Sequence, residues 1–140
     1  GKTAANNMVA NNADVIFHAA GGTGLGVIDA CKEAGIWAIG VDSDQSKVAP
    51  KTILTSAMKR VDNAVYDEAK AVLDGEYKAG VKTYTLEDGG VDIAPTTDNL
   101  SEELLKEVED VKAKIVAGEI KVPNNKADFE AKYGDIYELD

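Results

Sequence analysis

Three short segments carry side chains that could contact a small molecule. They are residues 17–26, 42–45 and 56–60, which include Phe17, Gly22, Asp42 and Lys59. An aromatic face can stack on a flat ring, and a carboxylate accepts hydrogen bonds from hydroxyl groups. A glycine loop lets backbone N–H groups approach a ligand closely. These residue types together predict a cleft for a small polar molecule.

The sequence offers no arrangement that supports nucleophilic or zinc chemistry. His18 is the only histidine, and no cysteine or serine nucleophile stands in a recognisable pattern with it. A catalytic dyad or a zinc site needs such a second group, so we expect His18 to be structural. Cys31, the only cysteine, lies in an apolar helical stretch and is interpreted as a small buried hydrophobe.

A calcium loop is also excluded, although Asp42 and Asp44 resemble the start of one. Counting from Asp42, the sixth position is Lys47 where such a loop has glycine, and the twelfth is Ile53 where it has glutamate. Two interpretations of these carboxylates remain open. They either cap the next segment as solvated turn residues, or one of them accepts hydrogen bonds from ligand hydroxyls.

The glycine loop suggests a dinucleotide-binding enzyme as an alternative. Asp42 follows it by about 20 residues, as the acidic residue of an NAD site would. The G-x-G-x-x-G spacing fails, however, because counting from Gly22 and Gly24 the third glycine position is Val27. The phosphate-loop spacing fails as well. A third interpretation is that the glycines only allow tight packing of a strand against a helix.

The elements that would position these segments form a parallel α/β arrangement. A helix over 3–12 precedes an apolar strand-length run at 13–20, and a helical stretch over 26–34 ends at Gly35. A second buried strand covers 36–41, which completes one βαβ unit, and a third apolar run covers 53–58. Ligands of open α/β sheets gather where the strands end, so Asp42 and Lys59 should share one rim and could pair there.

The remaining sequence predicts further elements of the same α/β lobe. Apolar residues recur at helical spacing over 61–75 and again over 101–117, where Gly118 ends the helix. Residues 82–86 alternate like a strand, a turn follows, and 91–95 is another short apolar run. Asn99-Leu100-Ser101 matches a glycosylation sequon, but beside a helix start we interpret it as a cap. We expect residues 124–140 to be an acidic tail in which Phe129, Tyr133 and Tyr137 are possible anchors.

Composition limits the classes of partner. The 140 residues carry a net charge of −10, a sequence pI near 4.5 and no cluster of Lys and Arg. This disfavours nucleic acid and anionic lipid as partners. No apolar run approaches the roughly 18–20 residues that cross a bilayer. No export signal is visible, and residues 1–5 resemble the entrance to a helix already in progress.

Five stretches in the same order resemble the basic membrane protein family, whose members include the PnrA-like purine nucleoside receptors. They are residues 13–24 (ADVIFHAAGGTG), 39–45 (IGVDSDQ), 54–62 (LTSAMKRVD), 88–94 (DGGVDIA) and 118–123 (GEIKVP). The resemblance covers residues 5–123 approximately, and the ordered set is more specific than any one stretch.

This resemblance implies one lobe of a type I periplasmic-binding-protein-like fold, in which two α/β lobes close on a ligand. Residues 1–123 would be the second lobe with its closing helix, and the first lobe would be missing from this chain. By matched position, Phe17 would stack on the nucleobase, Gly22 would offer a backbone contact, Asp42 would hold the ribose hydroxyls, and Lys59 would bind the sugar side.

The resemblance also implies a non-enzymatic receptor with no cofactor and no metal. It would be lipid-anchored outside the cytoplasm, with the signal and anchor not in this chain, and would hand a purine nucleoside to an ABC permease. Rival interpretations are the same fold binding a sugar or a signalling molecule, a regulatory domain that no longer transports, and the NAD-type enzyme. Fold alone does not separate these, because related folds bind many solutes.

Overall fold

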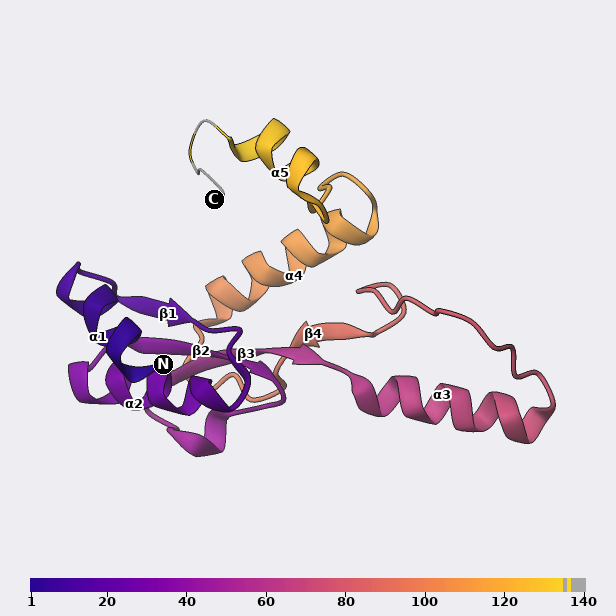
Figure 1. Cartoon of the computed structure of the whole chain (residues 1–140), viewed down its shortest axis with the longest axis horizontal. Helices are drawn as coiled ribbons and strands as arrows, with labels where there is room; N and C mark the ends of the chain where they lie inside the picture. Colours follow the sequence, from indigo (N-terminus) through magenta and orange to yellow (C-terminus); the bar gives the residue numbers. More distant parts are fainter. Residues whose placement is uncertain (135, 137–140) are drawn as a thin grey trace. The chain divides into compact units, whose positions relative to one another are not determined.

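The computed structural model describes residues 1–134 and 136. It comprises two compact units, Gly1–Leu105 and Lys106–Asp140. The first unit holds the sheet and all four candidate ligand residues (Figure 1).

The first unit begins with the predicted βαβ arrangement. Helix α1 (Lys2–Ala10) leads into strand β1 (Val15–Phe17), and a short 3₁₀ turn, η1 (Gly21–Thr23), opens helix α2 (Gly24–Ala34). Strand β2 (Trp37–Asp42) then pairs with β1 in parallel. Gly35 ends α2 with a φ of 70°, a left-handed conformation that glycine adopts without steric cost. This confirms the predicted helix end.

Two further strands extend the sheet in the order β1-β2-β3-β4. After a short 3₁₀ turn, η2 (Ser46–Val48), strand β3 (Ile53–Lys59) pairs with β2 in parallel. Strand β4 (Val91–Ile93) pairs with β3 in antiparallel orientation. The α/β fold class is confirmed, with a sheet that is parallel across three strands and carries an antiparallel edge strand.

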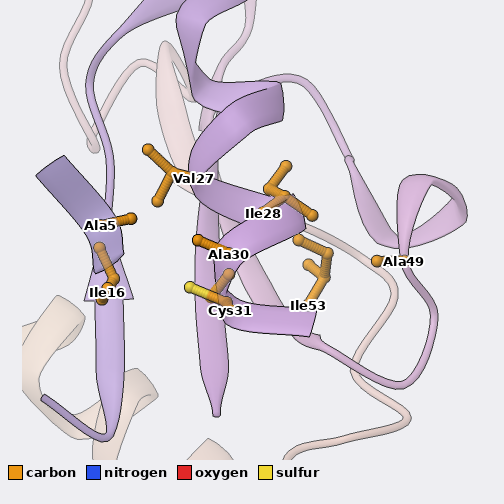
Figure 2. Packing of buried hydrophobic residues seen from close by; sticks show 9 residues of the cluster. Ala5, Ile16, Val27, Ile28, Ala30, Cys31, Ala49 and Ile53 are labelled. Atoms are coloured by element: carbon orange, nitrogen blue, oxygen red, sulfur yellow. The ribbon is translucent and has the colours of Figure 1, made fainter. Parts of the chain in front are cut away.

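The core of this unit lies between α2, α1 and one face of the sheet, and Figure 2 shows its side chains gathered around α2. Cys31 is fully buried among them, and burial raises the pKa of its thiol. This confirms the interpretation of Cys31 as a buried small hydrophobe. The buried cluster consists of Ala5, Ile16, Val27, Ile28, Ala30, Cys31, Ala38, Ala49 and Ile53.

Helix α3 (Val61–Asp74) forms where its apolar spacing predicts it, but it buries none of its residues. Val65 and Leu73, both in its apolar stripe, are exposed. Helical spacing is enough to predict the element, whereas burial requires a neighbour, and none covers this stripe in the described part of the chain.

The predicted strand over 82–86 is wrong, because this segment has no strand partner and runs irregularly. Its side chains contact α3 instead. The Lys82 ammonium lies 4.5 Å from the centre of the Tyr84 ring, and the Tyr84 hydroxyl donates to Glu68 Oε1 at 3.4 Å. Alternating polarity here reflects side chains that face α3 or solvent, rather than pairing in a sheet.

The chain after β4 continues with α4 (Glu102–Val116) and α5 (Lys126–Tyr133). The Ser101 hydroxyl accepts from the Leu104 N–H, which confirms the predicted cap at the start of α4. In α5 the Phe129 and Tyr133 rings lie 5.3 Å apart, whereas Tyr137 lies outside the described residues. The expected division of the chain after residue 123 stays a prediction.

Candidate functional site

Phe17, Asp42 and Lys59 are each the last residue of a strand, on β1, β2 and β3 respectively. These three strands are parallel neighbours, and the register pairs Phe17 with Ile39 and Asp42 with Met58. Their carboxyl ends therefore lie along one edge of the sheet, where α/β proteins bind ligands. The predicted convergence of the three segments holds in the structure.

Asp42 and Lys59 form the predicted pair, with 2.8 Å between Lys59 Nζ and Asp42 Oδ1. Their side chains are 51% and 66% exposed, and an ion pair this exposed contributes about 0–1 kcal/mol to stability. The pair therefore does little to stabilise the fold. It places a carboxylate beside an ammonium group on an accessible rim, which suits a ligand with vicinal hydroxyls.

Phe17 and His18 differ sharply in exposure, although they are neighbours in the sequence. The Phe17 side chain is 56% exposed, so it is not a core residue and its ring is accessible. His18 is only 4% exposed, and neither ring nitrogen has a hydrogen-bond partner among the described residues. His18 packs as a structural residue, while Phe17 is available for stacking.

The glycines of the loop differ in what surrounds them. A Cβ atom at Gly24 would fall 2.2 Å from Cε1 of the buried His18 ring, so the absence of a side chain there permits tight packing. Gly22 is exposed, and a Cβ atom there would meet nothing within 4 Å. The packing interpretation of the loop therefore applies to Gly24. The Gly22 backbone is open to solvent, and its contact with a ligand stays a prediction.

Two other charged residues of these segments have partners within the protein. Asp44 accepts hydrogen bonds from the Ser46 N–H at 3.0 Å and from the Thr96 hydroxyl at 2.6 Å, and chiefly the Thr96 bond lowers the pKa of its carboxyl. Arg60 pairs with Asp62 at 2.8 Å. Asp44 and Arg60 therefore bind neighbouring residues of their own segments or of the chain after β4, whereas Asp42 and Lys59 pair with each other across the rim.

Gln45 lies in the predicted segment 42–45, but sequence reasoning assigned its side chain no role. Its side-chain Oε1 accepts from the Val41 N–H at 3.0 Å, and its backbone N–H donates to the Ser56 hydroxyl at 3.1 Å. The available signal was Gly40, a glycine inside a strand, which marks a close approach of other atoms. Gln45 does not itself line the candidate site, but its two hydrogen bonds hold the loop that follows Asp42.

The candidate residues lie on an accessible rim, and two cavities of this unit are lined by other residues. A cavity of about 520 Å³ at the other end of β2 is lined by residues that include Trp37, Pro50 and Lys51. A smaller one of about 240 Å³ is lined by residues that include Ile53 and Thr96. Neither cavity is lined by a candidate ligand residue.

Residues 1–134 and 136 contain no group of three or more His, Cys, Asp or Glu side chains placed to hold a metal ion. Within the same residues, no helix combines the length and apolar character needed to cross a membrane.

Comparison with known proteins decides the family. The model of the Bmp family, described as PnrA-like ABC transporter substrate-binding proteins, matches residues 1–126. The chain belongs to the Bmp family. Its expected membership of the basic membrane protein family is thereby confirmed, and this is a family of substrate-binding proteins rather than of enzymes.

Two Bmp relatives illustrate the degree of similarity. The CD4+ T-cell-stimulating antigen of Listeria monocytogenes is 41% identical over 140 residues, covering 88% of this chain and 39% of that protein. Basic membrane protein D of Borreliella burgdorferi is 38% identical over 136 residues, covering 93% of this chain and 40% of that protein. The chain thus spans about two fifths of the length of these relatives.

Solved structures support the Bmp fold. A solute-binding protein of an ABC transporter system from Aeropyrum pernix K1 matches with a TM-score of 0.76 and 28% identity, covering 93% of this chain and 46% of that one. A transcriptional activator of the comK gene from Bacillus halodurans matches with a TM-score of 0.74 and 26% identity, covering 81% of this chain and 40% of that one.

Proposed function

We propose that this chain is the second lobe of an extracytoplasmic solute-binding protein that binds a purine nucleoside between two lobes. The observation that supports this most is the rim itself, where an accessible aromatic ring on β1 shares one sheet edge with the Asp42–Lys59 pair. A nucleoside combines a flat base with a ribose diol, and these are the groups that such a rim accommodates.

Each rim residue has a distinct role in this proposal. Phe17 stacks on the base, and the Asp42 carboxylate accepts hydrogen bonds from the ribose hydroxyls. Lys59 orients the carboxylate through a contact of 2.8 Å and binds the sugar side of the ligand. The exposed backbone at Gly22 offers an N–H donor. No proton or group is transferred, so the function is binding rather than catalysis.

The proposal includes two partners, and the greater length of the relatives supports the first of them, a further lobe. A first lobe covers the open rim, and closure of the two lobes shifts the population toward a state that an ABC permease recognises. The names of the basic membrane proteins support a location at the membrane, and a lipid anchor is part of this proposal.

The NAD-type enzyme is a weaker alternative. Its glycine spacing is broken at Val27, and the glycine nearest the helix start, Gly24, is occupied by packing against His18. A regulatory protein with the same ligand cleft is favoured by one observation, the similarity to the comK activator structure. A lipoprotein signal and cysteine encoded upstream of these residues would support the transport protein over the regulator.

The experiment that tests the proposal is a thermal-shift panel on the two-lobed protein, using purine and pyrimidine nucleosides, ribose and NAD. A ligand present at about 100 times its Kd stabilises the folded state by about 2.7 kcal/mol. We expect a shift with inosine, guanosine or adenosine and none with NAD. A shift with NAD alone would favour the enzyme, and a shift with ribose alone would favour a sugar receptor.

The matched variant for this panel is Asp42→Ala. Because it removes the proposed diol acceptor from an exposed position, we expect loss of the nucleoside shift while the fold remains intact. An unchanged nucleoside affinity would remove Asp42 from the site.

A further inference from the structure

Asp42 has an uncommon backbone conformation. Its φ is +69°, in the left-handed region that non-glycine residues occupy infrequently, although aspartate and asparagine do so more often than most. Holding such a residue in place costs on the order of 1 kcal/mol or more and requires support from the surrounding structure. The neighbours of Asp42 in the chain supply that support.

Gln45 makes two hydrogen bonds that hold the chain around Asp42. Its side-chain Oε1 accepts from the N–H of Val41, the residue that precedes Asp42, at 3.0 Å. Its own N–H donates at 3.1 Å to the hydroxyl of Ser56, a fully buried residue of β3. The segment from Val41 to Gln45 is therefore tied back to β2 and fastened to β3.

Gly40 makes the room that this arrangement needs. A Cβ atom at position 40 would lie 2.5 Å from Gln45 Oε1 and 2.5 Å from the Ser56 hydroxyl oxygen. Any other residue at this position would displace the Gln45 amide or the serine. Glycine weakens a strand interior, so its presence here is explained by the close approach of these two groups.

We infer that Gln45 is a positioning residue for ligand binding, which acts by fixing the Asp42 backbone so that the carboxylate faces Lys59 and the ligand hydroxyls. The inference rests on the proposed function for the nature of the ligand, and on the two Gln45 hydrogen bonds for the geometry. Gln45 itself touches no ligand in this scheme. Its effect should therefore appear only with ligands that carry the hydroxyls.

The test compares inosine with 2′,3′-dideoxyinosine by calorimetry on the two-lobed protein. In Gln45→Ala we expect the affinity for inosine to fall about tenfold, the cost of one hydrogen bond to a charged group. The affinity for the dideoxy compound, which cannot use Asp42, should stay within about twofold of wild type by the same reasoning. Gly40→Ala, which displaces the same amide, should show the same selective loss.

The matched control is Asn99→Ala. Asn99 is also a part-buried amide that braces backbone, donating to the carbonyl oxygens of Pro50 at 2.8 Å and Ile53 at 2.7 Å. These contacts lie at the start of β3, the opposite end from Asp42, so the ratio of the two affinities should not change. An unchanged ratio in Gln45→Ala, or an equal fall in Asn99→Ala, would overturn the inference.

A crystal structure of Gln45→Ala without ligand separates this inference from the proposed function. We expect Asp42 to leave the left-handed conformation and the Lys59–Asp42 pair to be lost. If the wild-type protein binds no nucleoside, the proposed function fails and this structural comparison alone decides the inference. An Asp42 that keeps its φ and its lysine contact would then contradict the positioning role.

Discussion

Asp42 combines an exposed carboxylate with a left-handed backbone, φ +69°. Strained residues of this kind concentrate at binding sites, where their cost to stability is tolerated for function. The lysine contact offsets little of that cost, because a pair this exposed contributes about 0–1 kcal/mol. The strain at Asp42 should therefore be measurable.

We predict that Asp42→Gly is more stable than Asp42→Ala by about 1 kcal/mol, since only glycine adopts this φ without a steric penalty. Both variants lose the carboxylate and should lose nucleoside affinity equally. Urea unfolding gives the stability difference, and calorimetry gives the affinities. Equal stabilities of the two variants would show that the backbone at Asp42 is not strained.

The glycine loop allows a similar comparison at the residue scale. Gly24→Ala places a methyl group 2.2 Å from the buried His18 ring, and forcing an atom into a packed site costs about 1–3 kcal/mol. Gly22→Ala meets no atom within 4 Å and should leave stability nearly unchanged. Thermal unfolding of the two variants checks this, and a similar loss in both would indicate that the loop acts as one rigid piece.

At the scale of elements, the loop after β2 is fastened to the segment that follows β4. The Thr96 hydroxyl donates to Asp44 Oδ2 at 2.6 Å, and the Ala94 N–H donates to the Ser56 carbonyl at 2.8 Å. The residues on either side of the candidate site are thus joined to the chain that leads into α4. The hydrogen bond from Thr96 changes the pKa of the Asp44 carboxyl, so the pH dependence of stability can report on this connection.

The pKa of Asp44 is lowered in the folded state, chiefly by the hydrogen bond from Thr96. Its stabilising effect is therefore complete above the ordinary aspartate pKa of about 3.9, and disappears as the pH falls through the lower folded value. We predict that Asp44→Asn is less stable than wild type at pH 7, by about 1 kcal/mol, and that the difference shrinks below about pH 4. Chemical unfolding at several pH values measures it, and a difference independent of pH would exclude ionisation as its source.

At the scale of the whole molecule, the rim is incomplete. The candidate residues are exposed, no cavity described above includes them, and the chain covers about two fifths of the length of its Bmp relatives. A ligand held by one lobe makes only part of its contacts and stays open to water. The proposed function assigns this enclosure to a second lobe.

We therefore predict that these 140 residues alone bind a nucleoside at least about 100-fold more weakly than the two-lobed protein, a difference of about 2.7 kcal/mol. Calorimetry on both forms checks this. The comparison needs circular dichroism of the shorter form, to establish that it is folded. Equal affinities would mean that one lobe suffices and that closure adds no contact.

The sequence by itself determined the element order, the parallel βαβ core and the three segments that carry Phe17, Asp42 and Lys59. Apolar runs, glycine helix ends and strand order are local signals, and the carboxyl ends of parallel strands must share an edge. The ordered stretches also led to the Bmp family. Local signals failed for residues 82–86, where alternation resembles a strand but no neighbour supplies a pairing edge.

Only the tertiary structure decided what each polar residue contacts. It separated Asp42 from Asp44 by giving one a lysine at the rim and the other the Thr96 hydroxyl. It also assigned Gly24 to packing against His18, and showed Gln45 bound to Val41 and Ser56. These contacts join residues that are up to 52 positions apart, and such distances depend on strand register and helix packing, which no local pattern encodes.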